Sequence, residues 1–154
     1  MTFRITGLDP APFQRLFALS DAELARENVQ RVRISDYPAA PCRISLDDVE
    51  KGGYALLLSY EHQPARTAYR QQGPIFISDA AAPFDAAGVV PPALARRPLS
   101  LRGFNDGGMM IEADLVEGSE AQHLIERFLA NPSVAYIHAH YARRGCFAAT
   151  IARA

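Results

Sequence analysis

The stretch VAYIHAHYA-RRG-CFAATIA, residues 134–152, decides the fold that the sequence predicts. Two apolar-rich runs, residues 134–142 and 146–152, are separated by Arg143, Arg144 and Gly145. A three-residue hairpin loop favours glycine in its last position, where the backbone takes a positive φ. The pattern therefore predicts an antiparallel β-hairpin near the end of the chain.

The predicted loop fixes which residues of this hairpin lie opposite one another. It pairs His138 with Thr150 and His140 with Ala148, so both imidazoles lie on one face above small side chains. Phe147 then lies on the opposite face, toward the core. A register shifted by one residue would bury both histidines in the core, which favours the register chosen here.

A second hairpin is predicted at residues 99–116, with residues 106–108, Asp-Gly-Gly, as its loop. This loop pairs Arg102 with Glu112 on a polar face. It also places Ile111 and Leu115 on the core face.

The other segments carry shorter signals for strands and helices. Strands are expected at residues 3–8, 31–34, 54–60 and 74–78, and helices after Asp9-Pro10, after the Ser20–Glu23 capping box and at residues 119–130. Residues 79–98 are rich in Ala and Pro, and this composition predicts a lid or a loose surface loop. We therefore expect one α+β domain over residues 1–154. Its sheet is mainly antiparallel or mixed, with N-terminal helices and one helix before the C-terminal hairpin.

Composition excludes several classes of partner. The net charge is -1, and the only basic clusters are the pairs at residues 96–97 and 143–144, so nucleic acid is not an expected partner. No apolar run approaches the roughly 18 residues of a membrane span, and residues 1–12 lack the pattern of a secretory leader. Two distant cysteines predict reduced thiols. These features predict a cytoplasmic protein without a membrane partner.

Short motifs along the chain resemble those of one bacterial family. They are PCR at residues 41–43, YEH at 60–62, GPIF at 73–76, LR at 101–102, YIHAH at 136–140 and GCF at 145–147. At these positions the chain resembles the family known as domain of unknown function 1203. The resemblance spans nearly the whole chain and supports a single domain, but it implies no reaction, cofactor or catalytic residue.

The favoured site is a cleft for a small anionic molecule beside the histidine face. Arginine and imidazole groups suit a carboxylate or phosphate. We expect His138 or His140 to act as acid or base in an enzyme reaction, with Arg43, Arg102, His62 and Tyr69 binding the ligand.

Other chemistries have weaker support in the sequence. Two histidines two residues apart on a strand can begin a metal site, but Arg143 and Arg144 stand where a cupin-like pattern would place a carboxylate. Cys42 and Cys146 are candidate reactive thiols, although neither lies in a known nucleophile motif. The chain has no Gly-x-Ser-x-Gly elbow, which disfavours a serine hydrolase. It has no Walker loop, so a nucleotide is not implied, and the sequence identifies no cofactor.

Three interpretations therefore remain open. The first is the small-molecule-binding domain described above, with or without catalysis. The second is a structural or protein-interaction module, in which a sheet face or edge pairs with another chain or forms a homo-oligomer. The third is a histidine-based metal-binding protein.

Overall fold

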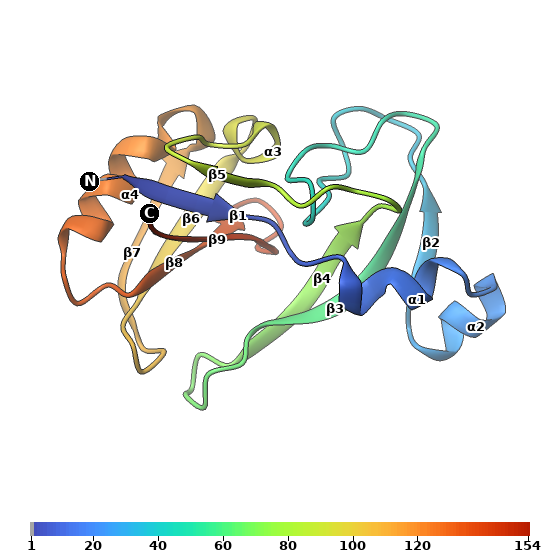
Figure 1. Ribbon diagram of the computed structural model, residues 1–154, viewed down its shortest axis with the longest axis horizontal. Coiled ribbons are helices and arrows are strands. Elements are labelled where there is room, and N and C mark those ends of the chain that lie inside the picture. The colour runs from blue at the N-terminus through green and yellow to red at the C-terminus, as the bar shows by residue number, and fades with distance from the viewer. Residues whose placement is uncertain (1) are drawn as a thin grey trace.

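A computed structural model describes residues 2–154 and contains two antiparallel sheets (Figure 1). The larger sheet has the strand order β5-β1-β9-β8-β6-β7. Its strands are β1 Phe3–Thr6, β5 Asp85–Ala87, β6 Pro98–Phe104, β7 Met110–Glu117, β8 Tyr136–Tyr141 and β9 Phe147–Arg153. The smaller sheet has the order β2-β3-β4, formed by β2 Gln30–Arg33, β3 Tyr54–Gln63 and β4 Gln71–Ile77.

The helices divide between the two sheets (Figure 1). Helices α1 Gln14–Phe17 and α2 Asp21–Arg26 lie beside the smaller sheet, and α3 Pro92–Ala95 and α4 Ala121–Ala130 lie beside the larger one. Short 3-10 turns at Ala11–Phe13 and Gly118–Glu120 precede α1 and α4. The expected α+β class is confirmed, and the paired strands are antiparallel rather than mixed.

Each sheet has its own hydrophobic core. Helix α4 buries Leu124, Ile125, Phe128 and Leu129 against the larger sheet, as their helical spacing predicts. In the smaller unit the Ser20 capping box forms, since the Glu23 amide donates to the Ser20 hydroxyl, and the α2 side chain Leu24 is buried.

The segment at residues 79–98 is part of the fold and not a lid or a loose loop. Its strand β5 pairs with β1, and the Gly7 amide donates to the Phe84 carbonyl. Leu94 of α3 is fully buried, and the Ala93 amide donates to the Leu46 carbonyl. The expectation failed because these anchors come from residues far away in the sequence, which the segment's own periodicity does not reveal.

The predicted register of the β6–β7 hairpin is correct only beside its loop. Phe104 lies opposite Met110, and Gly108 has a φ of 79° as the loop requires. A bulge between Gly103 and Phe104 shifts the remaining pairs by one residue. Arg102 therefore lies opposite Ala113 and not opposite Glu112.

The shift exchanges the two faces of β7. Its acidic residues turn toward α4, where Arg127 donates to the Asp114 carboxylate and Asn131 to the Glu112 carboxylate. Leu115, expected in the core, is 70 % exposed. Contacts to α4 thus favour the shifted register.

In the final hairpin the predicted register holds away from the loop and fails beside it. Its predicted pairs Ile137–Ile151, His138–Thr150 and Ala139–Ala149 form, and Gly145 has a φ of 81°. A bulge next to the loop places His140 opposite Phe147, where Ala148 was expected. Phe147 consequently lies on the histidine face, so this face does not have small neighbours alone.

The two sheets meet where β4 lies beside β9 (Figure 1). Long-range hydrogen bonds help to hold them together. Among these, the Arg43 Nε donates to the Phe147 carbonyl at 2.7 Å, and the Gln63 Nε2 donates to the Tyr136 hydroxyl at 2.9 Å. Among residues 2–154, no helix has the length and apolar composition needed to cross a bilayer.

Candidate functional site

Three histidines converge where the sheets meet. Strand β3 continues past Tyr60, where the sequence prediction ended it, and so carries His62 into the junction. The His62 ring lies 5.0 Å from that of His140 and 5.9 Å from that of His138, centroid to centroid. Phe147 lies among all three, stacked on His62 at 5.0 Å and edge-on to His138 at 5.2 Å.

Burial keeps these imidazoles neutral at neutral pH. It lowers the pKa of His138 to about 3 and that of His140 to about 4, with smaller contributions from neighbouring His62 and Arg102. The pKa of His62 is also lowered, chiefly by burial. Neutral imidazoles offer hydrogen bonds and packing surfaces but no positive charge for an anion.

Their polar contacts are sparse. His140 Nδ1 lies 2.9 Å from the Gly145 carbonyl, and His62 Nε2 lies 3.3 Å from the Gln71 side-chain oxygen. The Nδ1 atoms of His62 and His138 are buried without a partner among the described residues. In residues 2–154 no three or more His, Cys, Asp or Glu side chains are grouped so that they could hold a metal ion, and the Phe147 ring contacts all three imidazoles.

A cavity of about 270 Å³, here called the histidine cavity, lies beside this cluster. It brings together four of the six predicted site residues: His62, Tyr69, Arg102 and His140. His138 does not line it, and Arg43 lies elsewhere. Arg102 has no carboxylate partner among residues 2–154. Its closest polar contacts are Ser100 and Gln71, each at 3.4 Å, and burial lowers its pKa.

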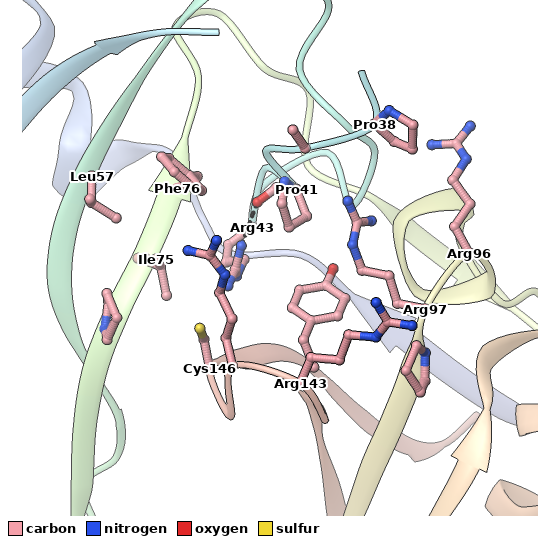
Figure 2. A pocket seen from close by; sticks show the side chains of 15 residues that line it. Pro38, Pro41, Arg43, Leu57, Ile75, Phe76, Arg96, Arg97, Arg143 and Cys146 are labelled. Carbon is pink, nitrogen blue, oxygen red and sulfur yellow. Dashed lines mark hydrogen bonds between the residues drawn. The ribbon is translucent and has the colours of Figure 1, made fainter. Parts of the chain in front are cut away.

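A larger cavity of about 610 Å³ lies between β4 and the final hairpin, and it contains Arg43 (Figure 2). We call it the arginine cavity, because five arginines line it together with Tyr141, Cys146 and mainly apolar side chains. The arginines are Arg43, Arg96, Arg97, Arg143 and Arg144, and the apolar residues include Pro41, Leu57, Pro74, Ile75 and Phe76. None of its lining residues is acidic.

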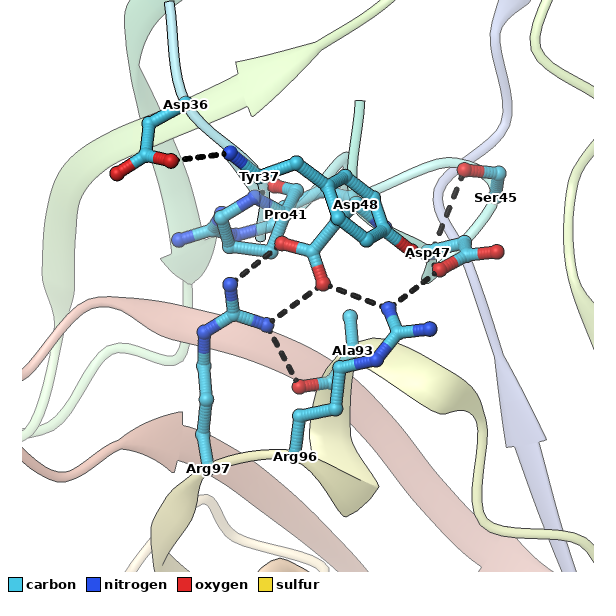
Figure 3. A network of polar contacts seen from close by, with 10 residues as sticks. Asp36, Tyr37, Pro41, Ser45, Asp47, Asp48, Ala93, Arg96 and Arg97 are labelled. Carbon is cyan, nitrogen blue, oxygen red and sulfur yellow. Dashed lines mark hydrogen bonds and ion pairs between the residues drawn. The ribbon is translucent and has the colours of Figure 1, made fainter. Parts of the chain in front are cut away.

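Two of these arginines are already neutralised by carboxylates (Figure 3). Arg96 Nη1 bonds to Asp47 and to Asp48, each at 2.8 Å, and Arg97 forms a two-nitrogen contact with the same Asp48. The Asp48 side chain is fully buried, so this network anchors its loop to the segment after α3.

The other three arginines have no carboxylate partner among residues 2–154. Arg43 is only 2 % exposed and donates to two backbone carbonyls, those of Phe147 and Pro41. Its burial lowers its pKa, but a guanidinium stays charged. Arg143 and Arg144 are exposed at the rim. The cavity therefore carries uncompensated positive charge.

Tyr141 gives the same cavity a free hydrogen-bond donor. Its ring lies beneath the guanidinium groups of Arg43 and Arg97, 4.9 and 5.3 Å from the ring centroid. The phenol is 6 % exposed, and its hydroxyl has no partner among the described residues. Burial raises the pKa of Tyr141 to about 12, so the hydroxyl remains protonated.

The two cysteines lie in different surroundings. Cys42 is 1 % exposed and accepts a hydrogen bond from Ser78. Burial acts to raise its pKa, but hydrogen bonds from Ser78 and Ser45 outweigh it and lower the pKa. Cys146 is partly exposed, and Figure 2 shows it turned toward the same space as Arg43 and Arg143.

Sequence reasoning identified Arg43 and Cys146 but not the rest of the arginine cavity. The signal was present, because the chain has two Arg-Arg pairs, at residues 96–97 and 143–144, and both reach this cavity. Their convergence depends on the antiparallel pairing of β6 with β8, which places Leu99 opposite Tyr141 and which local sequence does not reveal.

Comparison with known protein families gives a match. The family model described as "Protein of unknown function (DUF1203)" matches residues 39–153, a range that includes the lining residues of both cavities except Pro38. No curated protein and no solved structure matches the chain.

Proposed function

The chain belongs to the DUF1203 family of proteins of unknown function, and we propose that it binds a small organic anion in the arginine cavity. The observation that carries this proposal is the uncompensated charge of Arg43, Arg143 and Arg144 in a cavity without acidic lining. Guanidinium groups bind carboxylates and phosphates through paired, charge-assisted hydrogen bonds. A bound anion would supply the missing negative charge.

The other lining residues indicate which chemical groups the ligand should carry besides its negative charge. Pro41, Pro74 and Phe76 offer an apolar surface for a hydrophobic body. The free hydroxyl of Tyr141 favours an acceptor atom on the ligand. The volume of about 610 Å³ lies within the range of small-molecule sites. An aromatic or branched carboxylate or phosphate ester meets these requirements.

Acid–base catalysis by His138 or His140 is not part of the proposal. An efficient general acid or base has a pKa near the working pH, and these two have pKa values of about 3 and 4. The proposed activity is binding, with the histidine cluster as packing between the sheets.

Isothermal titration calorimetry with benzoate and phenyl phosphate tests this function, with neutral benzamide as the matched ligand. We expect the anions to bind and benzamide to bind much more weakly. The double variant R143A/R144A should weaken anion binding by about tenfold or more, because charge-assisted hydrogen bonds are lost.

The control variant R26A/R66A removes the same charge from exposed positions outside the cavity. It should leave anion affinity unchanged. Equal affinity for benzoate and benzamide, or equal weakening by both double variants, would contradict the proposal.

A second candidate function is self-association through β7, an edge strand of the larger sheet. Leu115 is 70 % exposed and Ile111 40 %, and an exposed apolar edge strand can pair with another strand. Antiparallel pairing of two copies about Ala113 would place Ile111 of one opposite Leu115 of the other. Sedimentation velocity should then find a dimer that Leu115→Glu dissociates. A wild-type monomer at the highest soluble concentration would contradict it.

A further inference from the structure

We propose that Cys146 is a site of thiol–disulfide exchange with small anionic disulfides that bind in the arginine cavity. This inference rests on the proposed function, because the same arginines would hold the carboxylates of the disulfide. It adds a covalent reaction that anion binding alone does not require.

The position of Cys146 gives its thiol both access and a positive environment. It directly follows the rim residues Arg143 and Arg144 and the turn residue Gly145. It is partly exposed and lines the cavity, facing the same space as Arg43 (Figure 2). Reactive cysteines occur in partly exposed, electropositive surroundings of this kind.

A second observation in the cavity points independently to a ligand. The Tyr141 hydroxyl is a buried donor without a partner among the described residues, and its side chain lines the same cavity. Buried donors are normally satisfied, so this one indicates an acceptor supplied from outside the chain. The carboxylate or amide oxygen of a peptide-like disulfide supplies such an acceptor.

The reaction needs no further oxidant. The Cys146 thiolate attacks one sulfur of the bound disulfide, a new sulfur–sulfur bond forms to Cys146, and the original sulfur–sulfur bond breaks. The leaving half departs as a thiolate and takes up the proton that Cys146 released. Cys146 is oxidised to a mixed disulfide, and half of the small disulfide is reduced to a free thiol.

The positive charge of the arginine cavity should determine which disulfides react fastest with Cys146. A cavity with uncompensated arginines concentrates anionic reagents and repels cationic ones, which changes encounter rates by tenfold or more. Glutathione disulfide is a negatively charged probe, and cystamine is a positively charged one. Cys42 serves as an internal control, because its thiol is 1 % exposed in the folded protein.

Intact-protein mass spectrometry over time tests the proposal, with peptide mapping to locate the adduct. We expect glutathione to add at Cys146 about tenfold or more faster than cysteamine from cystamine. R143A/R144A should reduce this ratio toward one, Cys146→Ser should abolish the adduct, and Cys42→Ser should retain it.

Benzoate titration of the reduced wild-type protein separates this proposal from the proposed function. If the wild type binds benzoate but reacts equally with both disulfides, or reacts at Cys42, the exchange proposal is overturned and anion binding stands. If benzoate does not bind and the charge preference is absent, both are overturned.

Discussion

The imidazole of His62 stacks on the phenyl ring of Phe147, with ring centroids 5.0 Å apart and planes 8° from parallel. The two residues lie on β3 and β9, so the pair joins the smaller sheet to the larger one. The Phe147 carbonyl also accepts a hydrogen bond from Arg43. Phe147 thus links the histidine cluster to the arginine cavity.

Truncating Phe147 should destabilise the protein strongly. Phe147→Ala removes a buried ring from between the sheets and should lower the free energy of unfolding by about 3 to 5 kcal/mol. Val89→Ala is the control, because this side chain is 49 % exposed and its truncation should cost less than about 0.5 kcal/mol. Urea denaturation measures both. A cost below that of the control would contradict the role of Phe147 in joining the sheets.

Acid should destabilise the protein through the buried histidines. Burial lowers the pKa of His138 from 6.5 to about 3 and of His140 to about 4, so the unfolded chain binds more protons below pH 6.5. The contribution of both neutral imidazoles to stability is therefore fully present above pH 6.5 and is lost as the pH falls toward 4. Each should contribute a slope of about 1.4 kcal/mol per pH unit.

Urea denaturation between pH 7 and 5 measures this slope in the wild type and in His138→Phe. In this variant the slope of the free energy of unfolding with pH should be smaller by the contribution of one histidine. His123→Gln, at an exposed position of α4, should keep the wild-type slope. If His138→Phe also keeps that slope, burial of a neutral His138 is refuted.

Two ion pairs of different burial should differ sharply in their contribution to stability. The side chain of Asp48 is fully buried between Arg96 and Arg97, whereas Asp85 and Arg4 form a half-exposed pair. Asp48→Ala should cost about 3 kcal/mol or more, because it leaves Arg97 without its charge partner. Asp85→Ala should cost far less, because solvent screens the Arg4–Asp85 pair. Thermal or urea unfolding compares them, and equal costs would show that the Asp48 network is not anchoring its loop.

Local signals in the sequence predicted most elements correctly. The capping box at Ser20, the apolar stripe of α4 and the two glycine loops act within a few residues, so the chain specifies them directly. The full register of the two hairpins could not be predicted from local sequence. Each contains a bulge, and the contacts around each bulge come from distant residues, such as Arg43 bonding to the Phe147 carbonyl.

For the candidate site too, the sequence predicted individual residues but not the contacts between distant segments. Arg43 and Cys146 were chosen for their chemistry, and the structure places both on the arginine cavity. The strand end expected at Tyr60 left His62 outside β3, because the sequence does not show that β3 reaches the larger sheet. The pairing of Arg96 and Arg97 with Asp48 likewise depends on tertiary contact. Only the packed chain distinguishes these neutralised arginines from the free ones.

The most direct test of anion binding is a crystal structure of the protein with 4-iodobenzoate, located by anomalous scattering from iodine. We predict the carboxylate at Arg43 and Arg143 and the iodinated ring beside Phe76 in the arginine cavity. The same experiment with R143A/R144A should give an empty cavity. A ligand bound only in the histidine cavity, or iodine that stays in place in the double variant, would contradict the proposed function.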